Sequence, residues 1–401
     1  MRRAAPLVAI AAAVASSCHG GTGDLPCAAG VPGYSWPIDP NALTPAPWPA
    51  GQPFTQAAHA PWPTVPGSAS GVLPSLRLVS IVTAGDPLHD ALFSFGDALV
   101  GSRWLQSFAP EYGAAASATS VHMDGTAAPS TMSYSDIVAY VRALEPSAPQ
   151  PTVYLLYLPP GTDAIVGQER NCGCAVIGGA HGDDGQGNAV AYVQRCSTTD
   201  DDSVTRVASH EVAESITDTG SGGYAIPQGN PPWLASPWAS VQPGGVEIGD
   251  LCSSTFVTEG EWTYQRQWSN AAAAAGGDPC VPALPTPYFS VTTDATWVQV
   301  APGASVEVPI TGWSTGERSD WYVYALPAEP TDTFSPAVTT ARQQPLSAVV
   351  YDAINDGVPG TLTVTAAPTA QSGDHTVVQI YSRSVDRVDG VHFWPVGFYV
   401  P

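Results

Sequence analysis

The stretch from Ser209 to Asp218 constrains the fold of this chain more than any other segment, because it places a histidine and several carboxylates at helical spacing. Residues four apart lie on the same face of an α-helix, one turn above the other. His210 and Glu214 can therefore ligate one metal ion, with Glu211 beside it. The spacing predicts a helix that carries a metal centre.

Two ligands at this spacing, an adjacent glutamate and an open position for water are what a metallopeptidase requires. The zinc motif of this kind is H-E-x-x-H, and here Glu214 replaces its second histidine. One imidazole with several carboxylates is a harder ligand set, so we expect zinc first, with manganese, iron or calcium as alternatives. The competing interpretation is an exposed acidic helix with an incidental histidine.

The charge of the chain argues against one class of partner. Its 35 acidic and 13 basic residues give a formal net charge of -22 at pH 7. Phosphate binding needs clustered lysine or arginine, so we expect no nucleic-acid partner. A length of 401 residues leaves room for two or three domains.

The first residues predict export. A charged start at residues 1–3 and an apolar run to residue 15 indicate a signal peptide over residues 1–17. Residues 15–18, Ala-Ser-Ser-Cys, resemble a bacterial lipobox, which would make Cys18 the lipidated first residue of a cell-envelope protein on the outer surface or in the periplasm. The lipid would then be the only contact with the membrane. Ordinary cleavage with free secretion is the alternative.

The remaining six cysteines support export, because an even number suits disulfides in an oxidising compartment. Sequence alone does not fix their pairing. Our working assignment joins Cys252 with Cys280 and either Cys172 or Cys174 with Cys196, which leaves the other near Cys27.

The order of expected elements indicates an α/β or α+β domain over residues 75–284, after a proline-rich tether over residues 18–74. Strands are expected at 76–83, 153–158 and 189–195, and the helix with His210 follows the last of them. Asp86 and Ser135 are expected to cap two earlier helices. Residues 178–188, which include His181, indicate a turn-rich, flexible loop.

Helical periodicity disappears after a proline-rich hinge at residues 282–287. Short alternating runs separated by proline and glycine then predict an immunoglobulin-like β-sandwich over residues 288–401, without its disulfide. We expect an accessory domain that binds wall polysaccharide or acts as a spacer. The runs lie at 297–300, 306–310, 321–326, 348–351, 361–365, 376–381 and 392–400.

Six blocks in a fixed order resemble bacterial secreted proteins that are distantly similar to the plant phosphate-induced, or exordium-like, family. The blocks are YLLYLPPGT at 154–162, a Cys-to-His-Gly segment ending at 181–182, AYV at 191–193, SHEVAESITD at 209–218, EIGDLC at 247–252 and QWSN at 267–270. The resemblance spans residues 76–281 and implies a zincin-like domain in which His210 and Glu211 belong to the active-site helix. Plant members largely lack this His–Glu pair, and the chain departs from the family pattern Thr-Asp-Pro at Thr219.

The resemblance also implies a third ligand downstream. Glu247 and Asp250 lie in a glycine-rich block before Cys252, and Glu247 is preferred because the family pattern repeats this glutamate five positions before the cysteine. Asp250 is the alternative ligand, or it caps a turn.

Two further residues are candidates for supporting roles. Asp218 lies two helical turns after His210 and is expected either to orient it or to end the helix. His181 is expected either to line the cleft or bind the metal, or to be an ordinary hydrogen-bonded loop histidine.

These observations predict an exported metal-dependent hydrolase, most plausibly a peptidase acting on a peptide or cell-wall substrate. His210, Glu214 and Glu247 would hold the ion, and Glu211 would deprotonate its water. The competing hypothesis is a non-catalytic surface protein that binds or adheres, with a structural metal or none. Glycoside hydrolysis by Glu211 and Glu247 is a third hypothesis that no motif supports.

Overall fold

The structure is a computed structural model that describes residues 53–149, 151–172, 178–195, 201–220, 222–229, 236–241, 246–317, 321–327, 333–339, 349–351, 357, 359–384 and 391–401. The expected signal peptide, Cys18, Cys27, Cys174 and Cys196 lie outside these residues. Over the part described, no helix is both long enough and apolar enough to cross a membrane. The described residues form two compact units, the first from 65–225 and 242–269 and the second from 53–64, 226–241 and 270–401.

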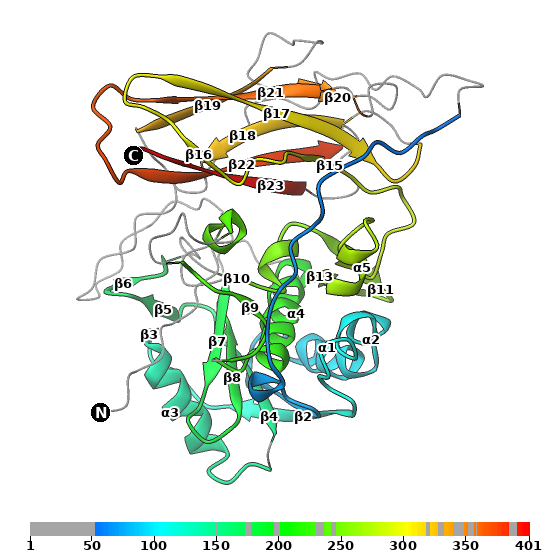
Figure 1. Cartoon of the computed structure of the whole chain (residues 1–401). Helices are drawn as coiled ribbons and strands as arrows, with labels where there is room; N and C mark the ends of the chain where they lie inside the picture. Colours follow the sequence, from blue (N-terminus) through cyan, green and yellow to red (C-terminus); the bar gives the residue numbers. More distant parts are fainter. Residues whose placement is uncertain are drawn as a thin grey trace. The chain divides into compact units, whose positions relative to one another are not determined.

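A five-stranded sheet forms the centre of the first unit (Figure 1). Four strands are parallel and the edge strand β7 runs antiparallel to its neighbour β8, which confirms the α/β expectation. In spatial order the strands are β2 (Ala118–Gly125), β1 (Leu76–Thr83), β4 (Thr152–Tyr157), β8 (Ala189–Val193) and β7 (Gly179–Asp183).

Helices cover both faces of this sheet, because successive strand side chains point to opposite faces. Val79 and Ile81 of β1 share a buried cluster with Ile137 of α3 (Tyr134–Leu144). Ser80, between them, faces α1 (His89–Gly101), whose Gly96 comes so close that a Cβ there would lie 2.5 Å from the Ser80 hydroxyl. The helix α4 (Asp201–Thr217) lies against β7, β8, β4 and α1.

Two helix starts differ from the expectation. Ser133, rather than Ser135, caps α3, and it forms a reciprocal capping box with Asp136. Asp86 does not cap α1. Its carboxylate accepts from the Leu88 amide in the turn before the helix and pairs with the buried Arg195 at 2.8 Å.

Shorter elements complete the first unit and the segments beside it. They include α2 (Arg103–Phe108), the small strands β3 (Thr131–Met132), β5 (Asp163–Val166), β6 (Glu169–Arg170), β9 (Ala225–Ile226), β10 (Val246–Glu247) and β13 (Gln267–Trp268), the hairpin β11 (Phe256–Glu259) and β12 (Trp262–Gln265), and the 3-10 turns η2 (Ala69–Gly71) and η6 (Asp250–Cys252).

The second unit is rich in strands, and every one of the seven expected runs is a strand. Two edge strands, β15 and β19, were not expected, and β19 carries Pro336, which a sheet tolerates at its edge. One sheet contains β15 (Phe289–Thr292), β17 (Ser305–Ser314), β21 (Pro359–Ala366) and β19 (Phe334–Thr339). The other contains β16 (Trp297–Gln299), β23 (Val391–Tyr399), β22 (His375–Ser384), β18 (Trp321–Pro327) and β20 (Val349–Tyr351). The unit also holds η5 (Pro237–Ser240), α5 (Asn270–Ala274) and β14 (Cys280–Val281).

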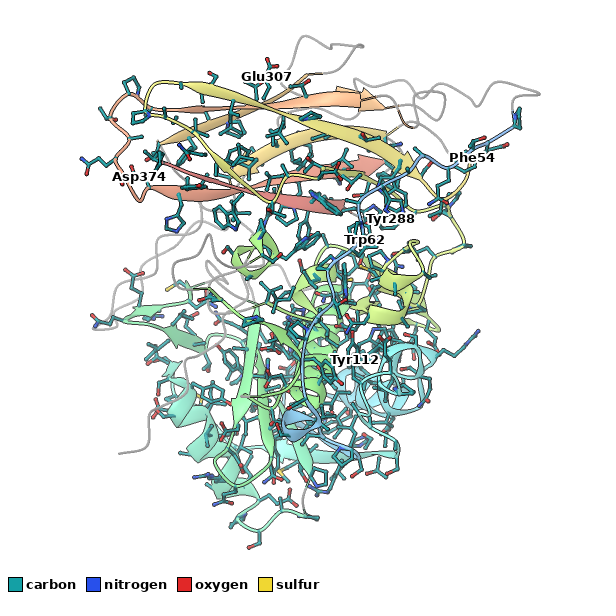
Figure 2. All side chains as sticks on the ribbon, in the orientation of Figure 1. Phe54, Trp62, Tyr112, Tyr288, Glu307 and Asp374 are labelled. Carbon is teal, nitrogen blue, oxygen red and sulfur yellow. The ribbon has the colours of Figure 1, made fainter. Side chains whose placement is uncertain are left out.

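Trp62 anchors the end of the expected tether in the core of the second unit. Its ring packs edge-on against Tyr288, with 5.9 Å between the ring centroids, and lies 5.2 Å from the ring of Trp394 (Figure 2). Its indole N–H donates to the carbonyl of Gly277 at 3.0 Å. This end of the proline-rich segment is therefore part of a folded core.

Candidate metal centre

The helix α4 buries its ionisable side chains. His210 is 2% exposed, and Glu211 and Glu214 are completely buried. Burying a charged group costs several kcal/mol unless it is paired, protonated or bound to a metal. The competing interpretation of an exposed acidic helix is therefore wrong, and these side chains need a cation or protons.

The strand β12 fixes the position of α4. The Thr205 hydroxyl donates to the Thr263 carbonyl at 2.9 Å, and one turn further on the Ser209 hydroxyl accepts from the Gln265 amide at 2.9 Å. These bonds hold the helix in register, so that the next residues, His210, Glu211 and Glu214, are presented at defined places.

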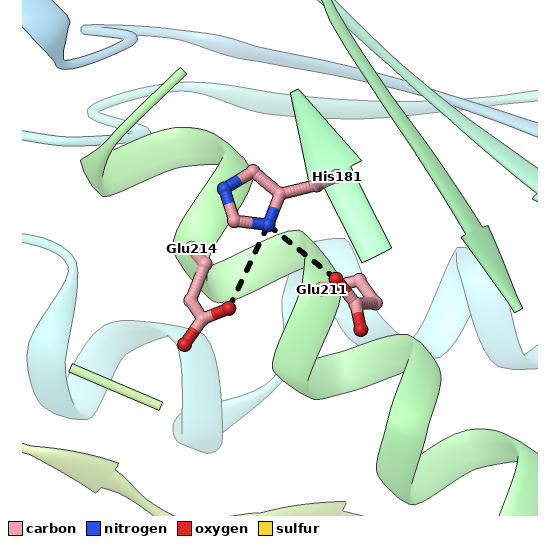
Figure 3. Close-up of side chains that lie close together, drawn as sticks. All are labelled: His181, Glu211 and Glu214. Atoms are coloured by element: carbon pink, nitrogen blue, oxygen red, sulfur yellow. Dashed lines mark ion pairs between the residues drawn. The ribbon is translucent and has the colours of Figure 1, made fainter. Parts of the chain in front are cut away.

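His181 lies on the edge strand β7, not in the flexible loop that the sequence indicated. Its Nε2–H donates to the main-chain carbonyl of Asp218 at 3.1 Å. Nδ1 faces two carboxylates, 3.4 Å from Glu211 Oε2 and 3.6 Å from Glu214 Oε2 (Figure 3). A histidine that donates one N–H to a carbonyl and presents its other nitrogen has the tautomer that a metal ligand needs.

His210 approaches Glu214 from the other side. Its Nε2 lies 3.0 Å from Glu214 Oε2 and 3.8 Å from Asp250 Oδ1. The side-chain amide nitrogen of Gln265 lies 2.7 Å from His210 Nδ1 and also donates to the Gly249 carbonyl at 2.9 Å. In this arrangement Nδ1 accepts and Nε2 carries the proton. Metal binding at Nε2 therefore requires the proton to move to Nδ1 and the Gln265 amide to present its oxygen.

The segment 246–252, which begins with β10, adds two more carboxylates. Asp250 begins η6, and its Oδ2 accepts from the Glu247 amide at 2.9 Å. This aspartate therefore shapes the turn and also belongs to a buried cluster of six side chains, which are those of His181, His210, Glu211, Glu214, Glu247 and Asp250. The Glu247 carboxylate reaches His181, with 3.5 Å between Oε2 and Nε2. Glu247, the expected third ligand, thus lies beside His181, and Asp250 is the acid that joins His210 and Glu214.

The potential ligand atoms of this cluster form two groups, and within each group all the atoms lie within 4.8 Å of one another. One contains His181, Glu211 and Glu214, and the other contains His210, Glu214 and Asp250. Glu214 is common to both.

Asp218 has the second of the two roles expected of it, because it ends the helix and its carboxylate does not orient His210. The helix ends at Thr217, and the Asp218 carboxylate accepts from the Gly220 amide at 3.1 Å. Its main-chain carbonyl, rather than its carboxylate, orients a histidine of the cluster, and that histidine is His181.

Most of the cluster's polar atoms lack hydrogen-bond partners among the described residues. They are His181 Nδ1, His210 Nε2, Glu247 Oε2 and both carboxylate oxygens of Glu211 and Glu214. Buried polar atoms in folded proteins are nearly always hydrogen-bonded, so these atoms, which form ion pairs with one another, are candidate ligands for a metal ion.

The pKa values of four cluster residues are raised, which shows that these side chains bind protons when no metal is present. Burial raises the pKa of Glu214 to about 8, although nearby His181 opposes the rise. Burial likewise holds the pKa of Glu247 and of Asp250 well above the usual range. Burial alone would lower the pKa of His181, but Glu247, Glu211 and Glu214 raise it well above its ordinary value. Without a metal, the cluster therefore binds protons tightly.

Two glycines leave the space that these side chains occupy. A Cβ at Gly249 would lie 2.7 Å from Glu214 Oε1 and 2.8 Å from His210 Nδ1, and a Cβ at Gly179 would lie 2.7 Å from Glu211 Oε1. The role of these two glycines could not be predicted from the sequence, because it depends on contacts between segments that are far apart in the chain.

Cys172, Cys252 and Cys280 are disulfide-bonded. This agrees with the disulfide-forming role expected of these cysteines. The pairing of the six cysteines stays a prediction, because three of them lie outside the described residues.

No protein-family model matches the chain, and a search of curated proteins finds no match. Distant likenesses exist among solved structures. A conjugative transposon lipoprotein from Bacteroides eggerthii shares 11% identity at a TM-score of 0.21, over 27% of this chain and 95% of that one. Domain 1 of VCBP3 from Branchiostoma floridae shares 16% at 0.19, over 29% and 96%. A variant of BcpA, the major pilin subunit of Bacillus cereus, shares 12% at 0.21, over 35% and 42%. Scores this low carry no argument about function.

Proposed function

We propose that the first unit is a metal-dependent hydrolase of the peptidase class, whose metal centre lies between α4, β7 and η6. The observation that carries the proposal is the set of buried histidine and glutamate atoms that converge without hydrogen-bond partners. Imidazole nitrogen and carboxylate oxygen form a donor set that zinc accepts, and manganese also suits it. The residues present therefore fit a divalent ion.

His210, Glu214 and Asp250 would hold this ion. When bound, a divalent ion supplies Lewis acidity and lowers the pKa of water. Glu211 follows His210 on α4, and both of its carboxylate oxygens lack hydrogen-bond partners among the described residues, so it can accept a proton. His181 Nδ1 lies 3.4 Å from Glu211 Oε2 and is the histidine nitrogen that faces this carboxylate.

The resemblance of residues 209–218 to a zincin active-site helix favours peptide bonds over other substrates. The predicted export of the chain fits a peptide substrate in or outside the cell envelope. The two strand-rich sheets of the second unit would then be an accessory domain of the immunoglobulin-like kind.

The experiment is cleavage of a broad peptide library by the zinc-loaded protein. Glu211→Gln is expected to lower the cleavage rate by about 10²-fold or more, because it removes the proton acceptor but keeps the side-chain shape. Glu261→Gln, an exposed glutamate of the same unit, is the matched control and should cleave like the wild type. Cleavage that survives Glu211→Gln, or a zinc-loaded wild type that cleaves nothing, contradicts the proposal.

A structural metal is the second candidate, and one observation favours it. The six side chains of the cluster are between 0% and 4% exposed. In that case, chelation would unfold the first unit, and the loaded protein would hydrolyse no peptide. A non-catalytic surface protein that binds or adheres would then be the better account.

A further inference from the structure

We propose that the cluster binds two divalent metal ions, bridged by the Glu214 carboxylate, with His181, Glu211 and Glu214 at one position and His210, Glu214 and Asp250 at the other. The inference rests on the proposed function and specifies its metal centre. It assigns His181 as a ligand at the second position and gives Glu211 a second role, because one carboxylate oxygen can ligate while the other accepts a proton.

The first argument is geometric. Ligands of one zinc ion lie about 2.0–2.3 Å from it and therefore no more than about 4.5 Å from one another. The two histidines fall in separate groups, His181 with Glu211 and His210 with Asp250. Only Glu214 belongs to both, and its Oε2 lies 3.6 Å from His181 Nδ1 and 3.0 Å from His210 Nε2. A carboxylate between two ligand sets is the usual bridge of a two-metal site, in which the ions are about 3.5–4 Å apart.

The second argument concerns the His181 position itself. The Asp218 carbonyl accepts from Nε2–H at 3.1 Å, so Nδ1 is left to face Glu211 and Glu214 (Figure 3). That nitrogen and all four oxygens of the two glutamates are buried and lack hydrogen-bond partners among the described residues. Nδ1 lies 3.4 and 3.6 Å from the nearest oxygen of each, which is about the ligand separation around a tetrahedral zinc.

The third argument is charge. Four carboxylates, those of Glu211, Glu214, Glu247 and Asp250, are at most 3% exposed. One divalent ion balances the charge of two carboxylates and two ions balance that of four. Buried carboxylates must be neutralised by protons or by cations, and two divalent ions neutralise all four in their ionised form.

The test is zinc content by elemental analysis after equilibrium dialysis of the full chain, with folding checked by circular dichroism. The wild type is expected to bind two ions per chain, and His181→Gln and His210→Gln one each. His122→Gln, an exposed histidine on β2, is the matched control and should keep two. A wild type that binds one ion, or a folded His181→Gln that still binds two, overturns the inference.

A second measurement needs no variant. The wild type saturated with Mn²⁺ should give the multiline electron paramagnetic resonance spectrum of an exchange-coupled pair. The six-line spectrum of isolated Mn²⁺ at saturation would contradict a bridged pair.

The inference and the proposed function can fail separately. One bound ion, with peptide cleavage that Glu211→Gln abolishes, overturns the pair of ions and leaves the hydrolase. Two bound ions without cleavage support the pair of ions and overturn the hydrolase.

Discussion

The proton on His210 decides whether its ring can bind a metal. Gln265 controls that proton, because its side-chain amide lies 2.7 Å from Nδ1 and is held by the Gly249 carbonyl. With zinc at Nε2, the Gln265 oxygen would accept from Nδ1–H, so Gln265→Leu is expected to weaken zinc binding at the His210 position by about 10–100-fold. Isothermal titration calorimetry measures this affinity.

Gln299→Leu is the control for that variant, because Gln299 is exposed on the second unit. It should bind zinc with wild-type affinity. Equal affinities for Gln265→Leu and the wild type would show that Gln265 does not orient His210.

Glu214 predicts a pH dependence of stability in the metal-free protein. Burial raises its pKa from 4.5 to about 8, so the folded state binds this proton more tightly than the unfolded state. Its contribution to the free energy of unfolding is therefore unchanged below about pH 4.5 and becomes steadily less favourable as the pH rises towards 8.

Urea denaturation with a chelator present measures this predicted fall in the free energy of unfolding with rising pH. Glu214→Gln, which cannot ionise, is expected to gain stability relative to the wild type between pH 5 and pH 8. A difference between the two proteins that stays constant with pH would contradict the raised pKa.

At the scale of elements, the close approach of the block 246–252 to α4 depends on Gly249. A Cβ there would lie within 2.8 Å of both His210 Nδ1 and Glu214 Oε1, so Gly249→Ala must displace the block or the two ligands. We expect a loss of stability of about 1–3 kcal/mol and zinc binding weakened at least tenfold. Thermal denaturation and calorimetry measure the two effects.

Gly101→Ala at the end of α1 is the control for Gly249→Ala, because nothing lies within 4 Å of a Cβ at that position. Wild-type zinc affinity in Gly249→Ala would mean that the block does not contribute to the site.

The elements that the sequence predicts well are those with a strong local pattern. The strand β1 has the expected bounds, and the helix with His210 and Glu214 is present with both side chains together. The edge strands β2 and β7 were not expected. β2 is half-exposed with polar residues, and β7 is rich in glycine, so neither has the apolar run of a central strand.

The composition of the site depended on long-range packing, which spacing does not show. The family resemblance favoured Glu247 as a ligand and Asp250 as the alternative, and the turn at η6 places Asp250 against His210. His181 and Gln265 reach the cluster only because β7 and β12 flank α4. The sequence therefore indicated the candidate ligands on the helix from their spacing, and named His181 and Asp250 only as alternatives.

For the whole molecule, the division into two units predicts which unit a bound metal stabilises against thermal unfolding. A ligand that binds only the folded state stabilises it by about 2.7 kcal/mol at a hundred times its dissociation constant. All cluster residues belong to the first unit. Removal of metal should therefore lower the unfolding temperature of the first unit and leave that of the second unchanged.

Differential scanning calorimetry with and without chelator measures both transitions. Tryptophan fluorescence of a Trp62→Phe variant assigns the transition of the second unit, since Trp62 lies in its core. Equal shifts in both transitions would contradict a metal centre confined to the first unit.

Anomalous X-ray diffraction at the zinc absorption edge, from crystals grown with zinc, tests the central claim most directly. The account predicts one anomalous peak among His181, Glu211 and Glu214 and another among His210, Glu214 and Asp250. Glu214 should contact both peaks. A well-ordered structure in which these side chains enclose no anomalous peak, although zinc is present in the crystal, would contradict it.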